Sequence, residues 1–130
     1  MIATQQYQAL SDFRFHLAHF MRFSERASRA AGITPTQYLL LLHIRGFPAQ
    51  RAPNIGELAE RLQSSPHGTA TLIARCVGLH LVRKRRSRAD RRCVAVLLRP
   101  RGRALLERIA RRHRDELKSL RSIFRVANVS

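Results

Sequence analysis

Residues 54–98 contain the pattern that most constrains the fold. A first run with apolar residues at helical spacing ends just before Ser64 and Ser65. Pro66 then opens a second helical run, because a serine hydroxyl can cap a helix start and proline is tolerated in the first turn. Two short strand-like segments follow around a charged tip, and apolar residues alternate in the second, at Val94, Val96 and Leu98. Helix, turn, helix and two-stranded ribbon, in this order, predict a winged helix-turn-helix.

The tip of the predicted ribbon is strongly basic. From Arg83 to Arg92, seven of ten residues are Lys or Arg, and Asp90 is the only acid. A run of this sign repels itself unless an anion lies opposite, so phosphate is the expected partner. A solvated charge run is the alternative interpretation.

Composition supports one globular, basic domain over residues 1–130. Hydrophobic residues make up 45%, and the formal net charge is +17. A chain this basic usually meets nucleic acid or an anionic surface, although a general preference for arginine accounts for part of the excess. We find no secretory signal, membrane span or cysteine spacing typical of metal sites, so we expect a cytoplasmic protein without cofactor. The motifs of an enzyme are absent from the sequence as well.

Long helices are predicted at both ends, over residues 5–30 and 100–127. The first has a wide apolar stripe, which suggests burial against its own domain and against a partner subunit. Between them, Thr34 and Gln37 flank Pro35 in a capping-box arrangement that starts a further helix. We therefore expect a mainly α fold with a small β-wing: a winged helix-turn-helix over 33–99, flanked by two dimerisation helices.

On these features the chain resembles the MarR (multiple antibiotic resistance regulator) family over residues 30–107. The matching stretches are ITPTQYLLLLHI, NIGELAERL, the Leu81–Val82 pair, the wing RADRRCVAVLL and RGRALLE. The resemblance implies a homodimer in which Arg92 reads the minor groove and Asp90 supports it. The sequence departs from the family pattern at three positions: His80 where the family commonly has Gly, Arg99 where a capping Thr is usual, and Thr71 where many members have Arg.

The candidate DNA-binding residues belong to the second helix of the motif and to the wing. Short polar residues allow close approach to phosphates, and longer ones reach base edges. We predict DNA contacts for Ser64, Ser65, His67, Gly68, Thr71, Arg75, Arg85, Arg86, Arg88, Asp90, Arg91 and Arg92. An ordinary solvated helix face is the alternative for the helical positions.

The resemblance also implies a cleft for a small aromatic or phenolic effector. Its expected lining is His19, Phe23, Tyr38, Leu42 and His43, with plain core packing as the alternative. His16 and His19 lie three residues apart, but no further ligand joins them, so we predict no metal site. A buried Cys76 is expected to be inert, which leaves redox sensing unfavoured.

Together these features predict a sequence-specific transcriptional regulator that acts as a homodimeric repressor on a pseudo-palindromic DNA site. Release by a small aromatic ligand follows from the resemblance. The alternative is an architectural protein that binds nucleic acid without sequence preference.

Overall fold

The computed structural model describes residues 1–89 and 93–126, without the side chains of residues 115, 119, 120 and 122–126. The fold is mainly helical, as predicted, with one two-stranded antiparallel sheet in the described part. Its elements in chain order are α1 (Thr4–Ala30), α2 (Pro35–Arg45), α3 (Ile55–Leu62), α4 (Pro66–Gly78), β1 (Val82–Arg86), β2 (Val94–Leu98) and α5 (Pro100–Val126).

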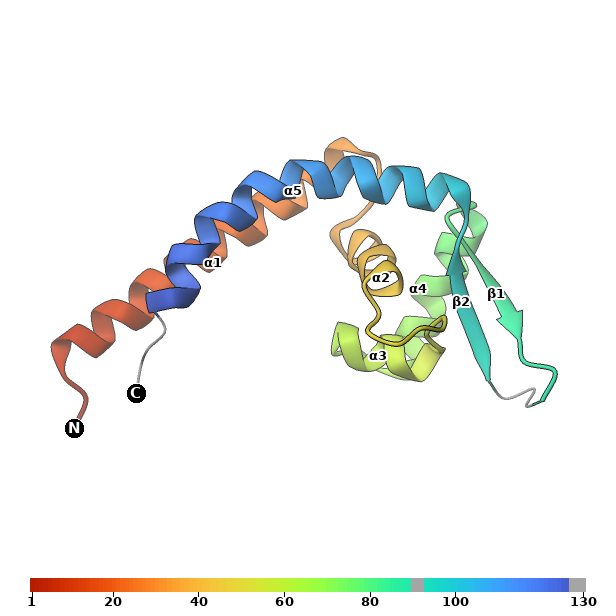
Figure 1. Cartoon of the computed structure of the whole chain (residues 1–130), viewed down its shortest axis with the longest axis horizontal. Helices are drawn as coiled ribbons and strands as arrows, with labels where there is room; N and C mark the ends of the chain where they lie inside the picture. The colour runs from red at the N-terminus through yellow and green to blue at the C-terminus, as the bar shows by residue number, and fades with distance from the viewer. Residues whose placement is uncertain (90–92, 127–130) are drawn as a thin grey trace.

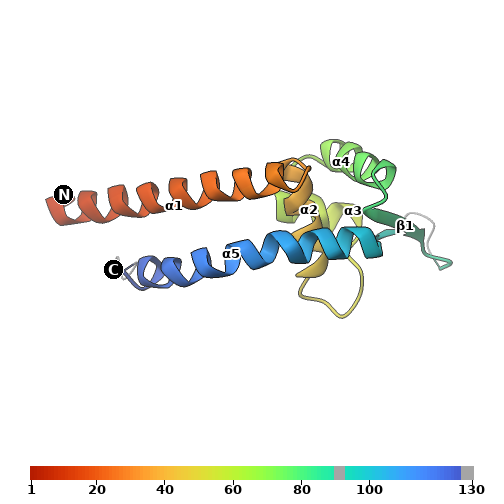
Figure 2. The same ribbon diagram turned by 90° about the horizontal axis from the view of Figure 1, so that it is seen from above.

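The chain divides into a compact head and a long two-helix arm (Figure 1). The head comprises α2, α3, α4 and the wing formed by β1 and β2. The terminal arm comprises α1 and α5, which run side by side in opposite directions, so both termini lie at its far end (Figures 1 and 2). No helix within the described ranges is long and apolar enough to cross a lipid bilayer.

Local hydrogen bonds explain where α2 begins. The Thr34 hydroxyl accepts a hydrogen bond from the Gln37 backbone N–H at 3.1 Å, and the Gln37 side chain accepts one from the Thr34 N–H at 3.0 Å. Pro35 occupies the first helical position. Gly32, between α1 and α2, has a φ of 87°, a left-handed conformation that favours glycine. The capping box predicted from the sequence is confirmed.

The helix-turn-helix is built from α3, a short turn and α4. Asn54 caps α3 by accepting a hydrogen bond from the Glu57 N–H at 2.8 Å. Gln63 ends α3 in a left-handed conformation, with φ of 52°. Ser65 caps α4 by accepting a hydrogen bond from the Gly68 N–H at 3.0 Å, and Pro66 is the first helical residue. A left-handed residue between two capped helix ends produces the tight turn.

The wing pairs β1 and β2 in antiparallel register, from Val82 opposite Leu98 to Arg86 opposite Val94. Val96 is fully buried, whereas the other residues of β2 are half-buried. The strands predicted from the sequence are therefore present, although the burial alternates less sharply than the sequence does.

The hydrophobic core lies in the head. Its fully buried side chains come from every element there and include Leu40, Leu41, Leu58, Ile73 and Val96. In contrast, α1 buries only Ala27 and Ser28, both in its last turns beside the head. The arm thus leaves most of its length outside the core of this single chain.

Candidate nucleic-acid interface

The predicted recognition helix, α4, presents one polar, exposed face. Its buried side consists of Thr69, Ile73 and Cys76, which pack into the head. The opposite side exposes every helical position predicted to contact DNA: Ser64, Ser65, His67, Gly68, Thr71 and Arg75. The structure therefore brings these six residues together at one surface, and their contact with DNA remains a prediction.

Two of these side chains already have partners within the protein. The Ser65 hydroxyl caps α4, and the Thr71 hydroxyl donates to the His67 carbonyl at 3.1 Å. Arg75 forms no ion pair within the described part of the chain. Arg75 therefore brings a positive charge to this face, and its side chain is long enough to reach a base edge or a phosphate.

The wing carries exposed cations next to α4. Arg83, Lys84, Arg85 and Arg86 are exposed along β1, and Arg88 is exposed beyond it. The strands are joined beyond their ends by the Ser87 N–H, which donates to the Cys93 carbonyl at 3.0 Å. The predicted tip residues Asp90, Arg91 and Arg92 lie outside the described residues.

Acidic residues do not neutralise the wing in the described part of the chain. The ion pairs found there join Arg51 to Glu57 and Arg111 to Glu107, and neither includes a cation of the wing. The charges of Arg85, Arg86 and Arg88 therefore remain uncompensated by carboxylates of the described residues. A surface of this kind attracts the phosphate backbone of nucleic acid.

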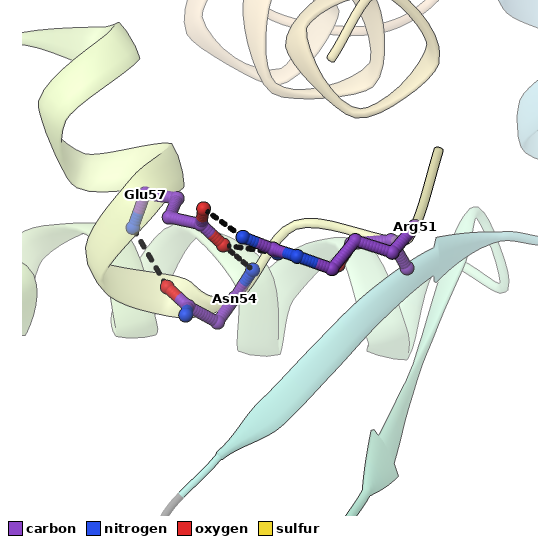
Figure 3. A network of polar contacts seen from close by, with 4 residues as sticks. Arg51, Asn54 and Glu57 are labelled. Atoms are coloured by element: carbon purple, nitrogen blue, oxygen red, sulfur yellow. Dashed lines mark hydrogen bonds and ion pairs between the residues drawn. The ribbon is translucent and has the colours of Figure 1, made fainter. Parts of the chain in front are cut away.

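Sequence reasoning missed Arg51, which belongs to the loop before α3 and lies beside the wing. Arg51 lines a groove of about 760 Å³ together with Arg85, Arg86 and Arg88. Figure 3 shows why the loop is held there: both terminal nitrogens of Arg51 bond to the Glu57 carboxylate at 2.7 Å. The same carboxylate accepts the Asn54 N–H at 3.1 Å. These bonds hold the pKa of Glu57 below its usual value.

The five residues expected to line an effector cleft are only partly brought together. Phe23 and Tyr38 lie around one side chain, His113. His19 is exposed on α1 and contacts the Phe15 ring instead. Leu42 packs against the hydrophobic core. For His43, burial and the charge of Arg61 lower the pKa of the imidazole.

His113 is the polar residue of this cluster that the sequence did not identify. Its ring stacks on Tyr38 with centroids 5.0 Å apart, and it meets Phe20 and Phe23 edge-on. Nδ1 lies 2.9 Å from the Ile109 carbonyl, so it carries the proton of that hydrogen bond. The buried Nε2 has no hydrogen-bond partner among the described residues and is left as an acceptor. Helical spacing from Leu106 and Ile109 was the available signal for its inward position.

The two cysteines differ in their surroundings. Cys76 is fully buried, and burial raises the pKa of its thiol to about 11, in line with the predicted inert thiol. Cys93 is exposed in the basic groove beside the wing. The described residues contain no group of three or more potential metal ligands.

A capped helix with an exposed polar face, beside a two-stranded ribbon with exposed cations, defines the winged helix-turn-helix class of DNA-binding proteins. The MarR family model matches residues 31–92 of the chain. The winged-helix module of this protein therefore belongs to the MarR family, the family that the sequence motifs indicated. The comparison with curated proteins found no match.

Solved structures extend the likeness to the terminal arm. A MarR-family transcriptional regulator from Silicibacter pomeroyi is 18% identical, with a TM-score of 0.74 over 99% of this chain and 81% of that one. A point mutant of MepR from S. aureus, bound to an oligodeoxyribonucleotide, is 18% identical, with a TM-score of 0.70 over 93% and 84%. BpsR of Bordetella bronchiseptica, whose DNA binding is regulated by 6-hydroxynicotinic acid, is 22% identical, with a TM-score of 0.65 over 82% and 74%. At these identities the likeness concerns the fold.

Proposed function

We propose that this protein is a sequence-specific transcriptional repressor that binds a pseudo-palindromic DNA site as a homodimer. The observation that carries the proposal is the joint exposure of the polar face of α4 and the cations of β1. In this arrangement α4 enters the major groove and the wing reaches the adjacent backbone. The oligonucleotide bound by the structurally similar MepR mutant supports the same use of the fold.

In the proposed complex, base contacts and phosphate contacts come from different residues. Arg75 reaches a base edge from the second half of α4, and His67 and Thr71 contact bases nearer its start. Arg85, Arg86 and Arg88 bind phosphates, with Arg91 and Arg92 carrying the contacts of the wing tip and Asp90 supporting Arg92. Arg51 lines the groove beside these cations, where its ion pair with Glu57 holds the loop before α3.

The terminal arm is the proposed dimerisation device. Large apolar side chains are exposed along it, at Tyr7, Leu10, Phe15, Met21 and Leu117. Exposed apolar surface of this extent on a folded chain is typical of a protein–protein interface. Pairing residues 5–30 and 100–127 of two copies would hold two heads, each formed by residues 33–99, on one face of a DNA duplex.

A small aromatic effector is proposed to bind near the ring cluster of Phe23, Tyr38 and His113. The cluster joins α1, α2 and α5, so a ligand there contacts both the arm and the head. The His113 Nε2 acceptor suits a phenol or ring N–H donor. The regulation of BpsR by 6-hydroxynicotinic acid supports a ligand of this kind.

Selection of DNA by the purified full-length protein tests the proposal against the architectural alternative. Duplexes recovered from a random pool are expected to share an inverted repeat, and to bind about 10³-fold more tightly than unrelated duplexes near physiological salt. Equal affinity for all duplexes would favour the architectural protein and contradict the proposal.

Matched variants then assign the roles of the cations. Arg75→Ala is expected to weaken binding to the selected site by about 1–3 kcal/mol and to relax the sequence preference of the protein at one base position. Arg85→Ala is expected to weaken binding to all duplexes alike. It should also reduce the slope of log K against log salt concentration by about 0.9. The control is Arg112→Ala, which removes the same charge from an exposed position of α5 and should change neither quantity.

A further inference from the structure

A groove on the side of the head opposite α4 contains none of the residues proposed to contact DNA or the aromatic effector. It has a volume of about 580 Å³ and lies between the loop that joins α2 to α3, the strand β2 and the first turn of α5. Figure 2 shows this loop and α4 on opposite sides of the first turns of α5. A molecule in the groove would therefore not compete with DNA for the face of α4.

The floor of the groove is apolar. Ile44, Pro53 and Val96 line it and are buried. Phe47 and Leu97 line it and are only half-buried, so each keeps apolar surface that the chain itself does not cover. Such a floor favours a partner that brings aliphatic side chains.

The rim of the groove is cationic. Arg45, at the end of α2, and Arg103, in the first turn of α5, line the groove and are exposed. Neither forms an ion pair within the described part of the chain, whereas Arg51, the third cation of the lining, is paired with Glu57. No described acidic residue belongs to the lining. The charges of Arg45 and Arg103 therefore favour a partner that carries carboxylates.

The strand β2 lines the groove with its edge and not with one face. Val96, Leu97 and Leu98 all belong to the lining, although successive side chains of a strand point to opposite faces. The Val96 N–H points to this edge, because it donates to the Pro53 carbonyl at 2.9 Å. Proline has no N–H with which to return the bond, so the Val96 carbonyl receives none from Pro53.

Leu98 is the next residue of β2 whose backbone points to the groove, because these directions alternate along an antiparallel pair. The Arg99 N–H, one residue further, points the other way and donates to the Leu81 carbonyl at 2.9 Å. No hydrogen bond of the Leu98 N–H or C=O outside the sheet is found among the described residues. An open strand edge of this kind can pair with an extended segment of another chain.

We propose that this groove binds an extended acidic segment of a partner protein. The segment adds a short strand beside Leu98, and its aliphatic side chains pack on Phe47 and Leu97. Its carboxylates lie beside Arg45 and Arg103. A second copy of this chain fits less well, because it would bring a rim of the same charge to the groove. This binding step does not depend on the proposed DNA-binding function.

Titration of the full-length protein with the blocked peptide Ac-EVDLEVD-NH2, in which acidic and aliphatic residues alternate, tests the binding step. Calorimetry and NMR are expected to show saturable binding, with the Leu98 amide shifted and protected from hydrogen exchange. Arg45→Gln combined with Arg103→Gln should weaken binding about tenfold, since both charges are solvent-exposed. The matched control is Arg101→Gln combined with Arg112→Gln, which removes two exposed charges of α5 that do not line the groove. Its affinity should stay within about twofold of the original.

Substitutions of Ala49 test the sign of the charge that the groove recognises. Ala49 lines the groove and is exposed, so a larger side chain there leaves the core unchanged. Ala49→Glu should weaken binding of the acidic peptide by at least about threefold, and Ala49→Lys should strengthen it by a similar factor. A change in the same direction in both variants would contradict recognition by charge.

Altered peptides separate the charge from the added strand. The basic peptide Ac-KVKLKVK-NH2 should bind at least about tenfold more weakly, and equal binding would overturn the acidic partner. The acidic peptide N-methylated at its three central residues should bind at least about fivefold more weakly, and equal binding would overturn strand addition. No saturable binding of the acidic peptide would overturn the site. Assembly of the protein beyond a dimer, reversed by the acidic peptide, would assign the groove to a second copy and also overturn the proposal.

Titration of the protein bound to its selected duplex tests whether the peptide and DNA bind together, and this step alone rests on the proposed function. The affinity for the peptide should stay within about threefold of that of the free protein at physiological salt, where charges more than about 8 Å apart are largely screened. Displacement of the peptide by the duplex would overturn simultaneous binding. Failure to select any duplex would contradict the proposed function, while the measurements on the free protein would still decide the groove.

Discussion

At the scale of single residues, Gly102 determines how closely α5 approaches the end of the helix-turn-helix. A Cβ at this position would meet the Leu81 carbonyl oxygen at 2.1 Å, and backbone cannot move away as a flexible side chain does. Gly102→Ala is therefore expected to destabilise the protein by about 1–3 kcal/mol in urea unfolding. Gly78→Ala is the control, since nothing lies within 4 Å of its added Cβ, and it should be neutral or slightly stabilising. Equal effects of the two substitutions would contradict this packing.

Glu57 gives a pH-dependent prediction at the same scale. Hydrogen bonds from Arg51 and from the Asn54 backbone lower its pKa in the folded state below the usual 4.5. As the pH falls, the unfolded chain protonates Glu57 before the folded protein does. Ionised Glu57 therefore stabilises the fold above about pH 4.5, and this stabilisation is lost as the pH falls toward the pKa of Glu57 in the folded state. Carboxyl NMR titration of Glu57 should show the lowered pKa, and Arg51→Gln should raise it toward 4.5. An unchanged titration in the variant would exclude the ion pair in solution.

At the scale of elements, α4 depends on a cap that also lies on the proposed DNA surface. Ser65 accepts the Gly68 N–H at the helix start, whereas no hydrogen bond is found for the exposed Ser64 side chain among the described residues. Ser65→Ala should lower the free energy of unfolding by about 1 kcal/mol, because a backbone donor loses its partner. Ser64→Ala should change it by less than about 0.5 kcal/mol. Thermal unfolding without DNA distinguishes this structural role from any effect on binding, and matching losses in both variants would argue against the cap.

The end of α4 shows how an element tolerates a departure from its family pattern. The sequence raises the question of where the helix ends, because His80 stands where glycine is common. The structure ends α4 at Gly78 and places His80 in the left-handed region, with φ of 61°. The Leu81 N–H still donates to the Cys76 carbonyl at 3.0 Å, which closes the helix end. The Leu81–Val82 pair therefore enters the wing as the resemblance implies.

At the scale of the whole molecule, the arm leaves apolar surface that the single chain does not cover. Phe15 is 59% exposed on α1, although a ring of this size usually packs in a core or an interface. Phe15→Glu is expected to weaken the proposed homodimer by about 2 kcal/mol or more, measured by sedimentation equilibrium. Thr36→Glu introduces the same charge at an exposed position of the head and should leave the dimer intact. A monomeric original protein would contradict dimerisation through the arm.

Local interactions are what the sequence determined by itself. The cap of α2 by Thr34 and Gln37, a serine cap on α4 and the strands of the wing could all be predicted, because each depends on residues a few positions apart or on a simple period. The structure shows that the serine is Ser65 and not Ser64. The exposed face of α4 followed from the same kind of period. The expected roles of the wing-tip residues stay predictions, since residues 90–92 lie outside the described part of the chain.

Contacts between distant parts of the chain were decided by the tertiary structure. Arg51 came to line the groove beside the wing, His113 entered the ring cluster with Phe23 and Tyr38, and Gly102 packed on Leu81. These groups are separated by many residues in sequence, and no period or cap relates them. Their placement depends on the path of the backbone, because only the packed core of the head brings the end of α1, the end of α4 and the start of α5 to one joint.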